Sequence, residues 1–195
     1  MKNCLAILIG HDEKSQGATG HFPGGPMSEY TFHHDHIAPL LFEYGNTPSL
    51  TTKIFTRNFG GVSGAYKNIN AWAESNIKNG MLNNACVELH FNAFNSKVAG
   101  TETLYDLEPK QSAILADHIQ EKLCQALKRP GKSRGSKLVQ EGRGAYNLQL
   151  CKIPGVLTEI AFCDNPDEAR LVWNLRHEYA RYLISGVNEY FKDTI

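Results

Sequence analysis

Short apolar runs alternate along this chain with segments of helical periodicity, and this alternation restricts the fold more than any other feature of the sequence. Short apolar runs bounded by turn residues are typical of buried strands, and longer amphipathic segments are typical of helices. The strand-like runs occupy 4–10, 50–59, 85–95, 100–107 and 151–162, and the helix-like segments occupy 29–45, 66–80, 108–129 and 164–191. We therefore expect an α/β fold: a single domain over residues 1–195, with a mixed, mainly parallel sheet of about six strands flanked by helices on both faces.

Local signals mark the ends of several of these elements. Ser28 is a candidate helix cap, and Pro39 predicts a kink in the helix that follows it. Asn165 has the cap position of one long final helix. The Gly- and Pro-rich segment 17–28 and the Gly-, Lys- and Arg-rich segment 129–145 have the composition of loops, and we expect no regular structure there.

Composition excludes several classes of partner. The 195 residues include 20 basic and 20 acidic side chains, so bulk charge attracts neither nucleic acid nor a membrane surface. The five cysteines form no CxxC pair, and we expect buried free thiols. We therefore expect the protein to be made in a reducing compartment. The N-terminal apolar run is too short for a secretory signal, and no stretch reaches the roughly 20 apolar residues of a membrane span. We expect no membrane insertion and no nucleic-acid partner.

Polar side chains lie at or near the ends of three predicted strands. His11 follows the first strand, His90 lies near the end of the third, and Glu159 lies in the last. Ligands of open α/β sheets bind at the carboxyl edge, where these residues would meet. Two histidines and a carboxylate are the usual ligands of a hydrolytic zinc site, and a second carboxylate moves the proton. Glu29 is the other candidate carboxylate, and the residue types alone leave open which of the two binds the metal.

The strand that carries His90 alternates in polarity. One side consists of Val87, Leu89 and Phe91, and the other of Glu88, His90 and Asn92. Alternation of this kind predicts one buried face and one functional face. We expect His90 to reach the site and Asn92 to shape its rim, while Glu88 either orients a ligand or pairs with a neighbouring side chain.

Four blocks of the chain, in order, resemble the motifs of the zinc-dependent N-acetylmuramoyl-L-alanine amidases of the type 3 family. The blocks are "ILIGHDEKSQGATG", "MSEYTFHHDHIAPLL", "VELHFNAFNSKVAGTETLY" and "IPGVLTEIAFCDNPDEARLV", and they span nearly the whole chain. Members of this family cleave the amide between the lactyl group of muramic acid and L-alanine in peptidoglycan. The resemblance implies that His11, Glu29 and His90 bind Zn²⁺ and that Glu159 is the catalytic carboxylate.

The chain departs from the family pattern around His11. Leu8 and Ile9 stand where the family has Asp and Pro, and Asp12 and Glu13 follow where glycines are usual. No departure removes an implied ligand. Asp12 or Glu13 is then the candidate for the carboxylate that holds the His11 ring in its orientation.

Two other functions stay open: a zinc carboxypeptidase-like peptidase that uses the same site, and a non-catalytic cell-wall glycan binder. Nucleotide binding is not expected, because "PGKS" at 130–133 lacks the earlier glycine of a phosphate loop. We expect peptidoglycan or muropeptides as substrate, and no separate wall-binding domain. Without a signal peptide, the enzyme would be made in the cytoplasm and would act either on the wall after release, as phage lysins do, or on wall fragments inside the cell.

A histidine cluster offers an alternative metal site. Glu29, His33 and His36 share one face of a helix by their spacing, and His34 lies beside them. The site at the strand ends explains more of the sequence, because it also accounts for His90. We therefore expect these three histidines to line a polar rim or a solvated helix face.

Overall fold

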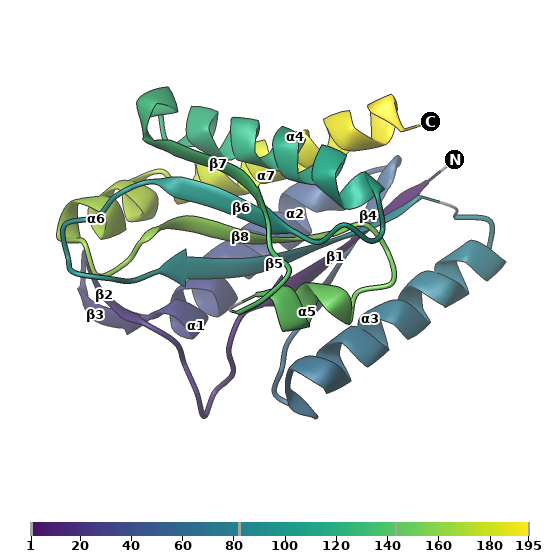
Figure 1. Cartoon of the computed structure of the whole chain (residues 1–195), viewed down its shortest axis with the longest axis horizontal. Coiled ribbons are helices and arrows are strands. Elements are labelled where there is room, and N and C mark those ends of the chain that lie inside the picture. The colour runs from purple at the N-terminus through teal and green to yellow at the C-terminus, as the bar shows by residue number, and fades with distance from the viewer. Residues whose placement is uncertain (1, 82, 143, 195) are drawn as a thin grey trace.

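A six-stranded sheet forms the centre of the molecule, in the order β4-β1-β5-β8-β6-β7 (Figure 1). The computed structural model describes residues 2–81, 83–142 and 144–194. The strands are β1 (Asn3–Ile9), β4 (Leu50–Phe55), β5 (Asn84–Asn92), β6 (Thr101–Tyr105), β7 (Ser133–Leu138) and β8 (Gly155–Phe162). Strands β4, β1, β5 and β8 are parallel, β6 is antiparallel to β8, and β7 is parallel to β6. The predicted α/β fold with a mixed, mainly parallel sheet is confirmed.

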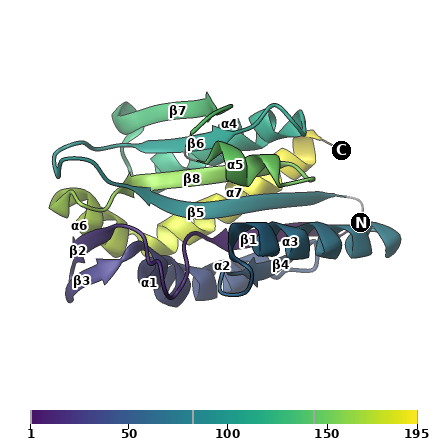
Figure 2. The same ribbon diagram turned by 60° about the horizontal axis from the view of Figure 1, so that its bottom comes forward.

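Helices cover both faces of this sheet (Figure 1, Figure 2). The longer ones are α2 (Ala38–Gly45), α3 (Gly61–Lys78), α4 (Gln111–Ala126), α6 (Pro166–Asn174) and α7 (Arg176–Asp193), and a short helix, α5 (Ala145–Gln149), precedes β8. Helices α2, α4 and α7 pack on one face, and α3 and α5 lie on the other. Within the described residues, no helix has both the length and the apolarity needed to cross a membrane.

The central strands are buried on both faces, which explains their nearly continuous apolar sequences. Leu5, Ile7 and Ile9 of β1 belong to the larger core on the side of α2, α4 and α7, whereas Ala6 and Leu8 belong to the smaller core on the side of α3. All five side chains are fully buried, so replacing Leu5 by Ala would lower the free energy of unfolding by about 2–5 kcal/mol. The cysteines are all buried and free, as predicted.

Strand β5 shows the alternation read from its sequence. Val87, Leu89 and Phe91 are buried in the larger core. Cys86 belongs to the smaller core on the side of α3, and Glu88 and His90 follow it at alternate positions on that face. Because β5 is paired on both sides, with β1 and β8, these polar groups stand on a rigid strand.

The first helical segment begins where the sequence predicts. It comprises α1 (Glu29–Thr31), a π-helical turn η1 (Phe32–Ile37) and α2. Ser28 is its cap, because the Ser28 hydroxyl accepts the backbone N–H of Thr31 at 3.0 Å. The kink predicted at Pro39 takes the form of the π-helical turn, in which the N–H of Ala38 bonds to the carbonyl of His33. The wider turn accommodates a proline that has no N–H to donate.

Segment 17–28 is not the loop that its composition predicts. It contains a hairpin of β2 (Thr19–Phe22) and β3 (Gly25–Ser28), so the prediction was wrong. Phe22 is buried and stacks on Phe32 with ring centroids 4.8 Å apart. Gly24 at φ 106° supplies the left-handed residue of the turn. The two strands have only four residues each and contain Gly or Pro, so their sequences show no alternation of apolar and polar residues. The burial of Phe22 comes from tertiary packing.

Segment 129–145 also differs from the prediction. It contains a 3₁₀ turn, η2 (Pro130–Lys132), and the edge strand β7. No side chain of β7 is fully buried, so the strand has no apolar alternation to reveal it in the sequence.

The final helix predicted over 164–191 is two helices. Asn165 caps the first one as expected, with its side-chain oxygen accepting the backbone N–H of Asp167 at 3.0 Å. The chain then turns at Leu175, because α6 packs against β2 and β8 while α7 packs against α4 and α2. Apolar residues continue through this break, which is why the sequence resembles one helix.

Candidate active site

His11, Glu29 and His90 come together at the carboxyl edge of the sheet. His11 follows β1, Glu29 opens α1, and His90 lies near the end of β5. His11 Nε2 is 3.2 Å from Glu29 Oε2, and His90 Nδ1 is 2.8 Å from Glu29 Oε1. One donor atom from each residue lies within 4.8 Å of the other two. The parallel pairing of β1 with β5 accounts for this meeting, because it places both strand ends side by side.

Glu29 is a buried anion between the two imidazoles. Its side chain is 2% exposed, and Oε1 also accepts the backbone N–H of Phe91 at 2.9 Å. Oε2 accepts the N–H of Ala18 at 3.2 Å. Burial raises the pKa of the Glu29 carboxyl, but hydrogen bonds from His11 and His90 lower it more, and the net pKa lies well below its ordinary value. The carboxylate is therefore ionised at neutral pH and needs positive charge beside it.

Two glycines let the backbone approach this group closely. A Cβ atom at Gly17, where φ is 78°, would lie 2.5 Å from Glu29 Oε2 and 2.6 Å from His11 Cδ2. A Cβ atom at Gly10 would lie 2.5 Å from the His90 ring. Any larger residue at either position would displace the histidines, so the site is closely enclosed by main chain.

The donor set fits a divalent cation. Two imidazole nitrogens and one carboxylate are the protein ligands of hydrolytic zinc sites, which leave a further position for water or substrate. Among the described residues, His11, Glu29 and His90 are the only His, Cys, Asp or Glu side chains that converge in a group of three. The alternative site on the first helix does not form, because the Glu29 carboxylate faces His11 and His90 instead.

The histidine cluster has other roles. His33 is fully buried, with Nδ1 bonded to the carbonyl of Glu29 at 3.1 Å and Nε2 3.5 Å from the hydroxyl of Tyr179. His34 is exposed and pairs with Asp35, and the His36 ring packs against Trp173. His33 therefore supports the backbone of Glu29, and the expected solvated helix face describes His34 alone.

Glu159 lines the same cleft as the three-residue group. It is half-buried on β8, and its register partner on the neighbouring strand β5 is His90. The cleft has a volume of about 780 Å³, and its walls include His11, Glu29, Arg57, His90, Tyr146 and Glu159. This is enough space for part of a glycopeptide, and it places a half-buried carboxylate beside the candidate metal ligands.

Glu88 is bonded to several neighbouring side chains of the site. It is fully buried and forms an ion pair with Arg57, whose side chain is 13% exposed. Tyr66 donates its hydroxyl to Glu88 Oε2 at 2.9 Å, and Asn147 donates its amide at 3.2 Å. His90 Nε2 lies 3.2 Å from Glu88 Oε1. Glu88 therefore pairs with a neighbour, as one of the two readings expects. It also contacts the candidate ligand His90, and its role in orienting that ring stays a prediction.

Sequence reasoning missed three of these partners. Arg57 follows β4 at the same edge of the sheet, so its position at a strand end was a usable signal. Tyr66 and Asn147 lie on α3 and α5, and nothing in the sequence relates either of them to Glu88.

Asn92 and Asp12 contribute less directly than expected. Asn92 donates its amide to Glu102 at 2.8 Å, across the strand β8 that separates them. Asp12 Oδ1 accepts the backbone N–H groups of Lys14 at 2.9 Å and Ser15 at 2.8 Å. Asp12 thus shapes the loop that follows His11, and its support of the His11 ring stays a prediction.

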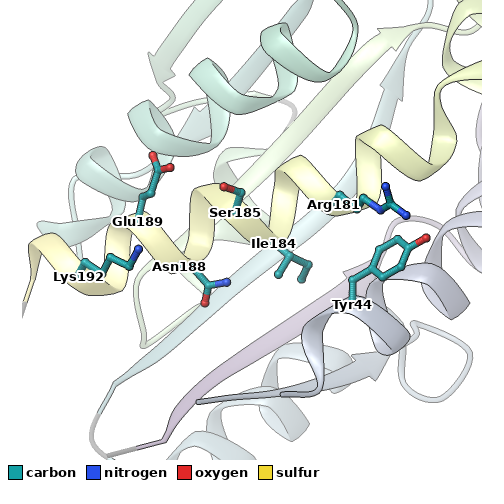
Figure 3. Close-up of a pocket in the computed structure, with 7 residues that line it drawn as sticks. All are labelled: Tyr44, Arg181, Ile184, Ser185, Asn188, Glu189 and Lys192. Carbon is teal, nitrogen blue, oxygen red and sulfur yellow. The ribbon is translucent and has the colours of Figure 1, made fainter. Parts of the chain in front are cut away.

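A second cavity, of about 380 Å³, lies between α2 and α7 (Figure 3). The Arg181 guanidinium there lies 5.1 Å from the centre of the Tyr44 ring, and Glu189 pairs with Lys122 at 2.7 Å. The cavity contains none of the predicted site residues and no converging set of metal ligands. The cleft at the carboxyl edge is therefore the candidate active site.

Known proteins resemble this chain in sequence and in fold. The model of a family described as N-acetylmuramoyl-L-alanine amidase matches residues 5–188. An uncharacterised cell wall amidase of Bacillus anthracis is 34% identical over 118 residues, which are 54% of this chain and 21% of that protein. The chain thus spans about a fifth of the length of this curated relative.

Solved structures share the fold over nearly the full chain. An N-acetylmuramoyl-L-alanine amidase from Clostridium difficile superposes with a TM-score of 0.76 at 19% identity, covering 98% of this chain and 97% of that one. The catalytic domain of CwlV, an amidase of the same description from Bacillus (Paenibacillus) polymyxa var. colistinus, gives a TM-score of 0.74 at 21% identity, covering 97% and 98%. At such identities the likeness concerns the fold.

Proposed function

Because this chain belongs to the N-acetylmuramoyl-L-alanine amidase family, we propose that it hydrolyses the amide between N-acetylmuramic acid and L-alanine in peptidoglycan or muropeptides. The family resemblance seen in the sequence is thereby confirmed. One observation carries the proposal: His11, Glu29 and His90 converge in a cleft that also contains Glu159. We propose residues 1–195 as one catalytic domain.

Metal dependence is general in this family, and Zn²⁺ is our proposed cation. His11, Glu29 and His90 would hold it, since their donor atoms are already close together. A zinc ion held there supplies a Lewis acid that polarises the scissile carbonyl and acidifies the attacking water. The ionised Glu29 contributes the negative charge that such a cation requires.

Glu159 is the proposed general base and then the general acid. Its carboxylate would take a proton from the attacking water and deliver it to the nitrogen of the leaving L-alanine. Its position fits this role, because its register partner is His90 and it lines the cleft. The leaving amine must be protonated for the C–N bond to break, and Glu159 is the carboxylate of the cleft that we do not assign to the cation.

Glu88 is the proposed positioning residue for His90. With the cation bound, His90 would donate Nε2–H to Glu88 and would turn the lone pair of Nδ1 to the cation in place of its hydrogen bond with Glu29. A carboxylate behind a metal-binding histidine fixes its tautomer and its orientation. The ion pair with Arg57 and the hydrogen bond from Tyr66 hold the Glu88 carboxyl group in place. Glu102, by contrast, holds Asn92 at the rim.

Analysis of digestion products tests this function. The zinc-loaded protein should release new amino termini of L-alanine from purified peptidoglycan, and Glu159→Gln should lose that activity. Glu189→Gln is the matched control, because it removes one carboxylate charge in the second cavity instead. Release of carboxyl-terminal amino acids would indicate the carboxypeptidase-like alternative. Binding of peptidoglycan without any cleavage would indicate the glycan binder.

A further inference from the structure

A polar row crosses the sheet from the candidate metal site toward the edge strand β7. His90 pairs with Glu159, and Glu159 pairs in turn with Glu102 of β6. Directly paired residues project to the same side of a sheet, so these three side chains share one face. The row therefore continues from the cleft wall at Glu159 to Glu102, on the side away from His11.

Two cationic side chains, those of Arg134 and Lys137, lie at the end of this row. Glu102 Oε2 accepts from Arg134 Nε at 2.8 Å and from Lys137 Nζ at 2.5 Å, while Oε1 accepts from Asn92. Glu102 is only 8% exposed, but the side chains of Arg134 and Lys137 are 37% and 41% exposed. Two positive groups against one negative group leave a net charge of plus one, with the cations toward solvent.

Both cations lie on the cleft side of the sheet. The opposite side of β6 and β7 faces α4, where Thr103 donates to Gln120 at 2.9 Å and Ser136 donates to Asp117. Lys137 follows Ser136 directly and so points the other way. Arg134 reaches the same carboxylate oxygen as Lys137, which places it on that side too.

The binding capacity of Arg134 is only partly used by Glu102. That bond comes from Nε, the inner nitrogen, and the two terminal amino groups donate to none of the described residues, so they can meet an acceptor on the substrate. Arginine and lysine together are suited to a carboxylate, which a charge-assisted pair of bonds would hold.

We propose that Arg134 and Lys137 bind a carboxylate of the stem peptide, on the residue that follows L-alanine. The inference rests on the proposed amidase function. Neighbouring strands lie about 4.8 Å apart, whereas L-alanine and the residue after it together span about 7 Å, at about 3.5 Å for each extended residue. With the scissile amide beside Glu159, the next residue of the stem therefore reaches the cations beyond Glu102. A D-glutamate linked through its γ-carboxyl presents its free α-carboxylate in this position.

Two muramyl dipeptides with the γ-carboxyl blocked as a methylamide test the proposal: N-acetylmuramyl-L-alanyl-D-glutamate, whose α-carboxylate is free, and its α-amide, the D-isoglutamine form. The zinc-loaded protein should cleave the free acid with a KM about tenfold lower and a similar kcat, as expected for one charge-assisted contact at a partly exposed site. Lys137→Gln and Arg134→Gln should each reduce the preference to less than about threefold by raising KM for the acid alone. Each variant keeps one cation on Glu102, so the fold of β6 and β7 is retained.

Lys53→Gln is the matched control, because it removes the same charge from β4 at the opposite edge of the sheet and should keep the full preference. The dissociation constants of both dipeptides for Glu159→Gln, measured by calorimetry, separate the two proposals because they need no hydrolysis. Tighter binding of the acid without cleavage by the wild type would support the subsite and contradict the amidase. Equal binding of acid and amide, or a preference that survives both substitutions, would overturn the subsite.

Discussion

His90 and Glu159 are direct partners in the register of the parallel strands β5 and β8. The pairing ties a candidate metal ligand to the proposed general base through two hydrogen-bonded backbones, without an intervening loop. Sites built on paired strands keep their geometry better than sites on loops. Glu29 completes the arrangement from α1, where Ser28 caps the helix and His33 bonds to the Glu29 carbonyl.

Glu88 gives the first prediction. Glu88→Ala should lower zinc affinity by about 10–100-fold, because His90 loses the partner that orients it. Glu88→Gln should lower it less, since the amide oxygen can still accept Nε2–H. Glu88→Ala should also cost about 3 kcal/mol in the free energy of unfolding, because Arg57 is left largely buried without its anion. Competition with a chelator and urea unfolding measure the two effects, and wild-type affinity in Glu88→Ala would contradict the positioning role.

A pair of glycines provides a second, steric prediction. Gly17 and Gly61 both have positive φ, at 78° and 62°, so an alanine at either strains the backbone. At Gly17 the new methyl group would also strike Glu29 and His11, whereas at Gly61 it meets nothing within 4 Å. We expect Gly17→Ala to weaken zinc binding by at least about tenfold and Gly61→Ala to leave it unchanged, with a stability loss of about 1 kcal/mol in each. Equal zinc affinities in the two variants would show that the tight enclosure is unimportant.

The pH dependence of stability follows from His33. Burial lowers the pKa of His33 to about 3, below the ordinary value of 6.5 that the unfolded chain retains. Between these values the unfolded chain binds a proton that the folded chain does not. Acidification below pH 6.5 therefore favours unfolding, by about 1.4 kcal/mol per pH unit at most.

Urea unfolding of the metal-free protein between pH 7 and pH 5 measures this effect. His33→Gln should flatten the pH dependence, while His34→Gln, at the exposed next position, should keep it. If both variants follow the wild type, another buried group must be responsible.

The sequence predicts helix ends that depend on neighbouring residues and strands that are buried or functional on both faces. β1 and β5 are recognisable because both of their faces are buried or functional, and Ser28 and Asn165 because a cap needs only its own helix. The hairpin β2–β3 and the edge strand β7 could not be predicted. Phe22 of the hairpin is buried by residues distant in the sequence, and β7 has no buried side chain that would produce an apolar pattern. The break at Leu175 is likewise set by what α6 and α7 pack against.

The residues of the candidate site also differ in whether the sequence predicts them. His11, His90 and Glu159 could be predicted because parallel strands deliver their ends to one edge. Glu29 was a candidate from its place at a helix start after the His11 loop, but its choice over Glu159 as metal ligand required the family resemblance, since an acidic residue in a first helical turn is common. Two partners of Glu88 could not be predicted, because Tyr66 and Asn147 come from two helices whose approach to β5 depends on the complete fold.

Zinc content measured beside amidase activity tests the central claim most directly. His90→Ala should lose both bound zinc and activity, because it removes a ligand of the proposed site. Glu159→Gln should keep about one zinc per chain, as the wild type should, and lose hydrolysis, because only the proton carrier is gone. Full zinc and full activity in His90→Ala, or loss of zinc in a folded Glu159→Gln, would contradict the assignment of metal and catalytic roles.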